Sequence, residues 1–173
     1  ANQLPFFTEY LKDGYVLASA DDISTGFMGL EYSGTNAKVI LTSSAISNAS
    51  EIYFPNTLTH LIIGEGVGSL YLNRDHASNL TFIAFEKEVS SLQNSNVSEV
   101  VLPEGVTDIG GMFSGCSNLK KVNFPSTLQT FGYGDAFSGC TSLETMVIPE
   151  GVTRIGSLTF SGCTALKTVV IPS

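Results

Sequence analysis

The residues best able to do chemistry in this sequence are its histidines and cysteines. His60 and His76 are the only histidines, and neither has a cysteine or carboxylate at the spacing of a metal site. We therefore interpret both as surface or rim residues and predict no metal ion.

The three cysteines, Cys116, Cys140 and Cys163, stand 24 and 23 residues apart. Each occupies the same place beside apolar residues, and an odd number cannot pair completely within one chain. We predict a ladder of reduced, buried thiols that serve as small apolar side chains.

Three glutamates also recur at one turn position: Glu65, Glu104 and Glu150. Converging carboxylates are the ligands that Ca²⁺ prefers. The turns between them carry Lys87 and Ser126 instead, which interrupts any such column. We interpret the glutamates as solvated turn residues.

No catalytic motif can be assembled. Residues 64–68, Gly-Glu-Gly-Val-Gly, have the glycines of a phosphate loop but lack its Lys-Ser/Thr ending. Neither a Ser-His-Asp arrangement nor a Gly-x-Ser-x-Gly elbow can be assembled from the sequence with any specificity. We predict that the protein is not an enzyme and uses no cofactor.

Charge and hydropathy exclude two classes of partner. Eight Lys and Arg stand against 16 Asp and Glu, a net charge of −8, and Arg74 and Arg154 have no basic neighbours. This argues against nucleic acid, which requires clustered cations. The apolar runs are strand-sized, so no membrane insertion is expected. The chain starts at Ala1 without a basic, apolar leader, so an export signal is not expected within it.

The elements that position these residues are repeated. Val-Val-Leu-Pro-Glu-Gly-Val at 100–106 returns as Met-Val-Ile-Pro-Glu-Gly-Val at 146–152 and as Val-Val-Ile-Pro at 169–172. Phe-Ser-Gly-Cys occurs three times between them. A period shared by unrelated residue types indicates tandem structural repeats. The prolines at 103, 125, 149 and 172 step by 22, 24 and 23 residues.

Each repeat reads as one coil of a solenoid. An apolar-x-apolar triplet predicts a short strand with two side chains inward, and Phe-Ser-Gly-Cys predicts a short helical or 3₁₀ segment stopped by its glycine. Stacked coils about 4.8 Å apart pair their strands in parallel around one core. Strands are expected to start at 52, 61, 83, 100, 122, 146 and 169, and the last four to span 100–102, 122–124, 146–148 and 169–171.

Residues 1–48 lack the unit, and we expect them to form an N-terminal cap over the first coil. Pro5 to Lys12 predicts a helix, and strands are expected at Tyr15–Ala18, Phe27–Tyr32 and Lys38–Thr42. Residues 49–173 form the predicted solenoid, with regular repeats over 97–173.

The text from Ile148 to Leu166, Ile-Pro-Glu-Gly-Val…Ile-Gly…Phe-Ser-Gly-Cys-Thr-Ala-Leu, resembles the BspA-type leucine-rich repeat. The resemblance is specific over 97–173 and extends more weakly over 49–96. It implies an α/β solenoid, a leucine-rich-repeat right-handed superhelix with one short parallel strand per coil. It also implies a secreted or cell-surface bacterial protein without catalytic residues, which binds host matrix proteins or another cell-surface protein.

Solenoids of this kind bind ligands through variable positions on the strand face. An apolar column at the middle of the strands is typical of a protein partner, although strand propensity accounts for the same valines and isoleucines equally well. The candidate partner-binding residues are His60, Ile62, Phe82, Ala84, Glu99, Val101, Lys120, Lys121, Asn123, Glu144, Val147, Lys167 and Val170.

A carbohydrate-binding or polysaccharide-active β-solenoid is the alternative. It requires aromatic platforms, with paired carboxylates if it is catalytic. Tyr53, Phe82 and Tyr133 are the aromatic residues considered for that role, and they are scattered along the sequence.

The last coil is expected to expose part of its apolar surface. Further repeats in a longer protein, end-to-end contact with a second copy, or fraying of the last coil would each relieve the cost of this surface and of the open strand edge. Of these we predict an end-to-end homodimer through the C-terminal coil. The exposed side chains are expected to be Leu158, Phe160, Leu166, Val169 and Ile171.

Overall fold

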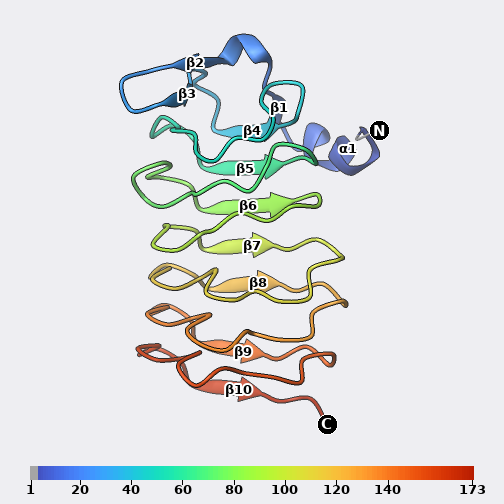
Figure 1. Cartoon of the computed structure of the whole chain (residues 1–173), viewed down its shortest axis with the longest axis vertical. Coiled ribbons are helices and arrows are strands. Elements are labelled where there is room, and N and C mark those ends of the chain that lie inside the picture. Colours follow the sequence, from blue (N-terminus) through green and yellow to red (C-terminus); the bar gives the residue numbers. More distant parts are fainter. Residues whose placement is uncertain (1–3) are drawn as a thin grey trace.

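The structure is a computed structural model that describes residues 4–173. It is a stack of coils, each of which contributes one short strand to a parallel column (Figure 1). The elements are α1 (Leu4–Lys12), β1 (Val16–Leu17), a 3₁₀ turn (Ala20–Asp22), β2 (Ile23–Thr25), β3 (Leu30–Tyr32), β4 (Lys38–Leu41), β5 (His60–Ile63), β6 (Phe82–Phe85), β7 (Glu99–Val101), β8 (Lys121–Asn123), β9 (Thr145–Val147) and β10 (Thr168–Val170).

The strands pair in parallel, as the repeat predicts. One sheet has the order β1-β4-β5-β6-β7-β8, and β9 and β10 form a separate parallel pair. The last four strands begin one residue before the predicted triplets, because Glu99 pairs with Lys121 and Thr145 with Thr168. In each of these coils, the residue before the first inward-pointing side chain therefore belongs to the paired strand.

The short coil predicted at 52–54 is wrong. Strand β4 pairs directly with β5, so no coil lies between them. Tyr53 instead forms an isolated parallel bridge with Glu31, and the backbone N–H of Phe54 donates to the carbonyl of His76. This segment lies on the side of the coils away from the strands, where Asp108, Thr130 and Arg154 make a similar column of bridges.

The core fills the inside of the coils. Phe85 is fully buried there, because the first and third residues of each apolar-x-apolar triplet point inward. Phe113, Phe131 and Phe137 are also fully buried, and they enter the core from the segments between the strands. The Phe-Ser-Gly-Cys segments are hydrogen-bonded turns rather than the expected helical segments. Their glycines adopt the left-handed conformation that such a turn requires, with φ near 76° at Gly115.

The N-terminal region does more than cover the first coil. The helix predicted at 5–12 is present as α1, and strands form at 16–17, 30–32 and 38–41 within or across the predicted spans. Strand β4, expected inside the cap, is the first full strand of the solenoid sheet. An antiparallel hairpin of β2 and β3 extends from the same end of the stack (Figure 1).

Candidate binding face

We use the term outer strand face for the side of the sheet that points away from the core. Helix α1 covers part of it, because Phe7 and Tyr15 form a second, separate apolar cluster with Ile40, Ile62 and Ala84. Ile62 and Ala84 are completely buried. Their assignment to a partner-binding face is therefore wrong.

The sequence contains a signal for this covering. Strands β4, β5 and β6 read Val-Ile-Leu, Leu-Ile-Ile and Ile-Ala-Phe, which are continuous apolar runs. Such runs are typical of strands buried on both faces. A helix with Phe6, Phe7 and Tyr10 precedes them in the chain and supplies the covering side chains. A cap over the first coil, as expected for residues 1–48, would put this helix at the end of the stack, whereas it packs on the strand face.

His60 and Phe82 lie at the margin of the covered area and are half-buried. The His60 ring stacks on Phe82 at a centroid distance of 5.6 Å and meets the edge of Tyr15 at 6.2 Å. Burial and then the nearby ammonium of Lys38 hold the pKa of His60 below its ordinary value. Burial raises the pKa of Tyr15 to about 12.

The outer strand face is open from β8 to β10, while Val101 of β7 packs at the margin of the α1 cluster. Its middle column carries Val101 and Asn123, both half-buried, followed by Val147 and Val170, which are 60% and 47% exposed. This part of the face brings together the remaining candidate residues: Glu99, Lys120, Lys121, Glu144 and Lys167.

Charge on the open face differs from that of the whole molecule. Three of the eight basic side chains lie there, Lys120, Lys121 and Lys167, against the carboxylates of Glu99 and Glu144. Glu99 also accepts a hydrogen bond from the side-chain amide of Asn123 at 3.2 Å. Side chains of both charge signs therefore surround the exposed valines, although the net charge of the protein is −8.

The sheet is interrupted between β8 and β9. Within residues 4–173, the strands on either side of this junction belong to different sheets, and Figure 1 shows a wider interval there than between other neighbouring strands. The same coils remain joined elsewhere, since the N–H of Phe131 donates to the carbonyl of Arg154 at 3.0 Å. The separation is therefore local to the strand face.

The interruption opens a path toward the core. A cavity of about 380 Å³ is lined by Lys120, Ser142, Glu144 and Thr145, and an adjoining one of about 220 Å³ reaches inner side chains. The inner residues Val122 and Phe124 are consequently half-buried, whereas their counterparts in the preceding coil, Val100 and Leu102, are buried. The lining of the second cavity is Lys120, Lys121, Val122, Phe124, Leu143, Thr145, Met146 and Val147.

The interpretation of His76 as a surface residue is also wrong. This side chain is 4% exposed. Its Nε2 lies 3.0 Å from a carboxylate oxygen of Glu51, and its Nδ1 lies 2.8 Å from the side-chain oxygen of Asn73. The ring is flanked by Tyr53 and Tyr71 at centroid distances of 4.6 and 5.7 Å. These contacts hold one coil to the next.

The cysteines are free, as predicted. Cys116 and Cys140 are buried, while Cys163 in the last coil is half-buried. Each thiol donates to a backbone carbonyl of the preceding coil. The Sγ–O distances are 2.9 Å from Cys116 to Leu92, 3.2 Å from Cys140 to Phe113 and 3.0 Å from Cys163 to Phe137. Burial raises the pKa of all three thiols. Across the described chain, no three His, Cys, Asp or Glu side chains are grouped to hold a metal ion.

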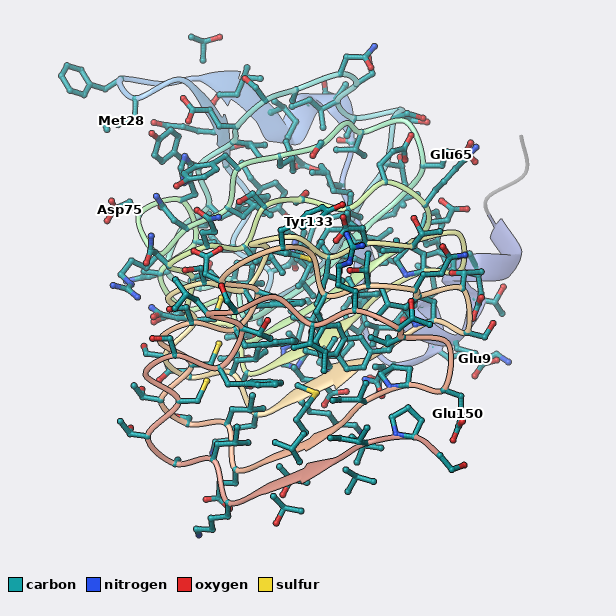
Figure 2. The ribbon with its side chains drawn as sticks, turned by 60° about the horizontal axis from the view of Figure 1, so that its bottom comes forward. Glu9, Met28, Glu65, Asp75, Tyr133 and Glu150 are labelled. Atoms are coloured by element: carbon teal, nitrogen blue, oxygen red, sulfur yellow. The ribbon has the colours of Figure 1, made fainter. Side chains whose placement is uncertain are left out.

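The turn glutamates bind neighbouring turns. The Glu65 carboxylate lies 2.6 Å from the ammonium of Lys87, and Glu104 accepts hydrogen bonds from the backbone N–H and the hydroxyl of Ser126. Hydrogen bonding lowers the pKa of both carboxyls. Glu65 and Glu150 lie along one edge of the stack (Figure 2). The carboxylates of Glu65 and Glu104 are thus used in side-chain contacts between adjacent coils.

The aromatic residues considered for sugar binding do not form a platform. Tyr53 packs on His76, and Phe82 packs on His60 beside α1. Tyr133 is 81% exposed and lies against the guanidinium of Arg154, 4.5 Å from its ring centroid. The three rings therefore belong to three different environments.

The fold and the open strand face define a parallel β-solenoid repeat protein. Residues 87–173 match the model of the BspA type leucine rich repeat region in six copies, and the chain belongs to this family. No protein of curated function matches it in sequence. Among the described residues, no helix has the length and apolar character needed to cross a bilayer.

Two solved structures are similar. A leucine-rich repeat protein of T. pallidum superimposes with a TM-score of 0.56 at 21% identity, over 91% of this chain and 72% of that one. A leucine rich cell surface protein of Faecalibacterium prausnitzii gives a TM-score of 0.46 at 22% identity, over 90% of this chain and 46% of the other. The first similarity supports the fold.

Proposed function

We propose that this chain is a non-catalytic protein-binding module of an exported or cell-surface bacterial protein. It binds a host matrix protein or another surface protein through the open part of the outer strand face, from the margin of α1 at β7 to β10. Membership of the BspA-type repeat family supports this role, and the description of one structural neighbour as a cell surface protein is consistent with the location.

The observation that carries the proposal is the contrast between the two halves of the outer strand face. Where α1 packs, the middle residues Ile62 and Ala84 are buried. Beyond α1, Val147 and Val170 occupy the same position in their strands and face solvent. Exposed aliphatic side chains in a row, bordered by charges of both signs, are typical of a protein-binding surface.

The test is capture of host matrix proteins and bacterial surface proteins on the immobilised chain. We expect a Val147→Asp, Val170→Asp double variant to lose the captured protein. Ile155→Asp is the matched control, because Ile155 is 41% exposed and follows Arg154 in the column of bridges away from the strands. Equal capture by the double variant and the control would contradict the proposal.

A further inference from the structure

We propose that the partner inserts an extended peptide segment between β8 and β9 and so completes the interrupted sheet. This inference rests on the proposed function and specifies how the partner is recognised. Every other junction along the coils, from β4–β5 to β7–β8 and β9–β10, is a hydrogen-bonded parallel ladder. The interruption is therefore a specific feature of one junction.

Peptide groups on both sides of the opening face it. The N–H of Lys121 donates to Ser98, and the carbonyl of Asn123 accepts from Leu102, so both residues bond toward β7. Peptide groups alternate in direction along a strand, so those of Val122 point toward β9. By the same alternation, the peptide groups of Thr145 point toward β8.

The pattern on β9 confirms this direction. The carbonyl of Glu144 accepts from Lys167, and the N–H of Ile148 donates to Val170, so residues 144 and 148 bond toward β10. Thr145 and Val147 lie between them and face β8. Both edges thus offer donors and acceptors that a single inserted strand would satisfy at once, as happens when a peptide is added to a sheet edge.

The side chains around the opening suit a peptide. Adjacent strands stand 4.7–4.9 Å apart, so one inserted strand needs about twice that interval, and Figure 1 shows that β8 and β9 are the pair set apart. An inward side chain of the occupant would meet Val122, Phe124 and Met146, which are apolar. An outward side chain would lie level with Asn123 and Val147.

The charges at the opening select little between peptides of different charge. Backbone hydrogen bonds are therefore the main determinant of peptide binding. Lys120 and Glu144 lie at the same end of the opening and have opposite signs. The expected occupant is therefore a short extended segment with an apolar residue pointing inward and no required charge. A sugar chain could not reproduce the alternating N–H and C=O groups of a strand.

The test uses amide hydrogen exchange on the isotope-labelled full chain, read by NMR. In the free protein, the amides of Thr145 and Val147 should exchange roughly tenfold or more faster than that of Met146, whose N–H faces β10. Val122 should likewise exchange faster than Val100, which faces β8. Strong protection of Val122, Thr145 and Val147 in the free protein would mean that the sheet closes in solution and would overturn the proposal.

The probe is an acetylated, amidated peptide with the sequence Thr-Met-Val-Ile, the text of 145–148 that already pairs in parallel with β10. At about 1 mM, a concentration that reveals weak binding, it should slow exchange at Val122, Thr145 and Val147. The same peptide with a methylated central amide should not. No protection by the first peptide, equal protection by both, or protection by an oligosaccharide instead would overturn the proposal.

Two variants test the protein side. Thr145→Pro removes the backbone donor that faces the opening and should weaken binding of the peptide roughly tenfold or more. Thr145→Ala keeps the backbone donor and removes only the exposed side chain, so it should bind the peptide at least several-fold more tightly than Thr145→Pro. If Thr145→Pro does not fold, as exchange at Val100 would reveal, the methylated peptide still decides the question.

The outcomes separate this inference from the proposed function. If capture of the partner depends on Val147 and Val170 but the peptide leaves the amides unprotected, strand insertion fails and the binding face stands. If the double variant captures protein normally, the proposed face fails, whatever the peptide does.

Discussion

The rings of Phe113 and Phe137, from adjacent coils, are stacked with centroids 5.3 Å apart and planes 8° from parallel. Phe137 continues the stack to Phe160 at 5.9 Å and 11°. The Phe137 ring therefore contacts a ring from the coil on either side of its own. The same Phe-Ser-Gly-Cys text that marks the repeat also builds this stack.

Phe137→Ala should lower the free energy of unfolding by about 3–5 kcal/mol, because it leaves a cavity in a fully buried position. Denaturant melts measure the change. Glu104→Gln is the control and should have little effect, because the exposed side chain keeps an oxygen that can accept from Ser126. A larger loss in the control than in Phe137→Ala would contradict the assigned repeat frame.

Alkylation of the thiols should follow their burial. The pKa of all three thiols is raised, but Cys163 is only half-buried and should react with iodoacetamide before the buried Cys116 and Cys140. Mass spectrometry of peptides from the native and denatured protein gives the order. The untreated protein should also contain no intramolecular disulfide, and a mass lower by two protons would refute this.

Titration of His60 should have a midpoint below about 6.5, the ordinary value for histidine. The unfolded chain binds this proton more readily than the folded one, so stability should fall as the pH drops from about 6.5 through the folded pKa. NMR of the ring protons measures the midpoint. Lys38→Met should move it upward by removing a nearby positive charge, whereas an unchanged midpoint in that variant would rule out the role of Lys38.

The last coil should promote self-association of this chain. Leu158, Val169 and Ile171 are 57%, 38% and 71% exposed, and β10 pairs only with β9 in this structure. We propose that two copies meet end to end through this apolar surface and strand edge. Light scattering at micromolar concentration should detect a dimer, and Ile171→Asp should reduce it. A monomeric wild type would argue against this contact.

The sequence predicts the coils well because their period is carried by several residue types at once. Proline, the inward apolar pair and Phe-Ser-Gly-Cys all repeat, so the strand at 145–147 could be placed within one residue. The irregular part from 49 to 58 could not, since Tyr53 and Phe54 bond across to Leu30 and His76 rather than form a coil.

The binding face was predicted less completely, for two reasons. Burial of Ile62 and Ala84 depends on where α1 docks, and local patterning does not specify a contact between distant segments. The interruption between β8 and β9 depends on backbone spacing. Val122-x-Phe124 has the same apolar pattern as Val100-x-Leu102, so side-chain type cannot distinguish an open junction from a closed one.

The position of α1 has a consequence for how such proteins can change in evolution. The helix packs against β4 to β6, with Val101 of β7 at the margin of the same cluster, and leaves β8 to β10 free. Duplication or loss of coils beyond β7 would therefore lengthen or shorten the accessible surface while the helix-covered end stays the same. The number of coils would then set how large a ligand the protein accommodates, without any change in helix α1, which covers the N-terminal end.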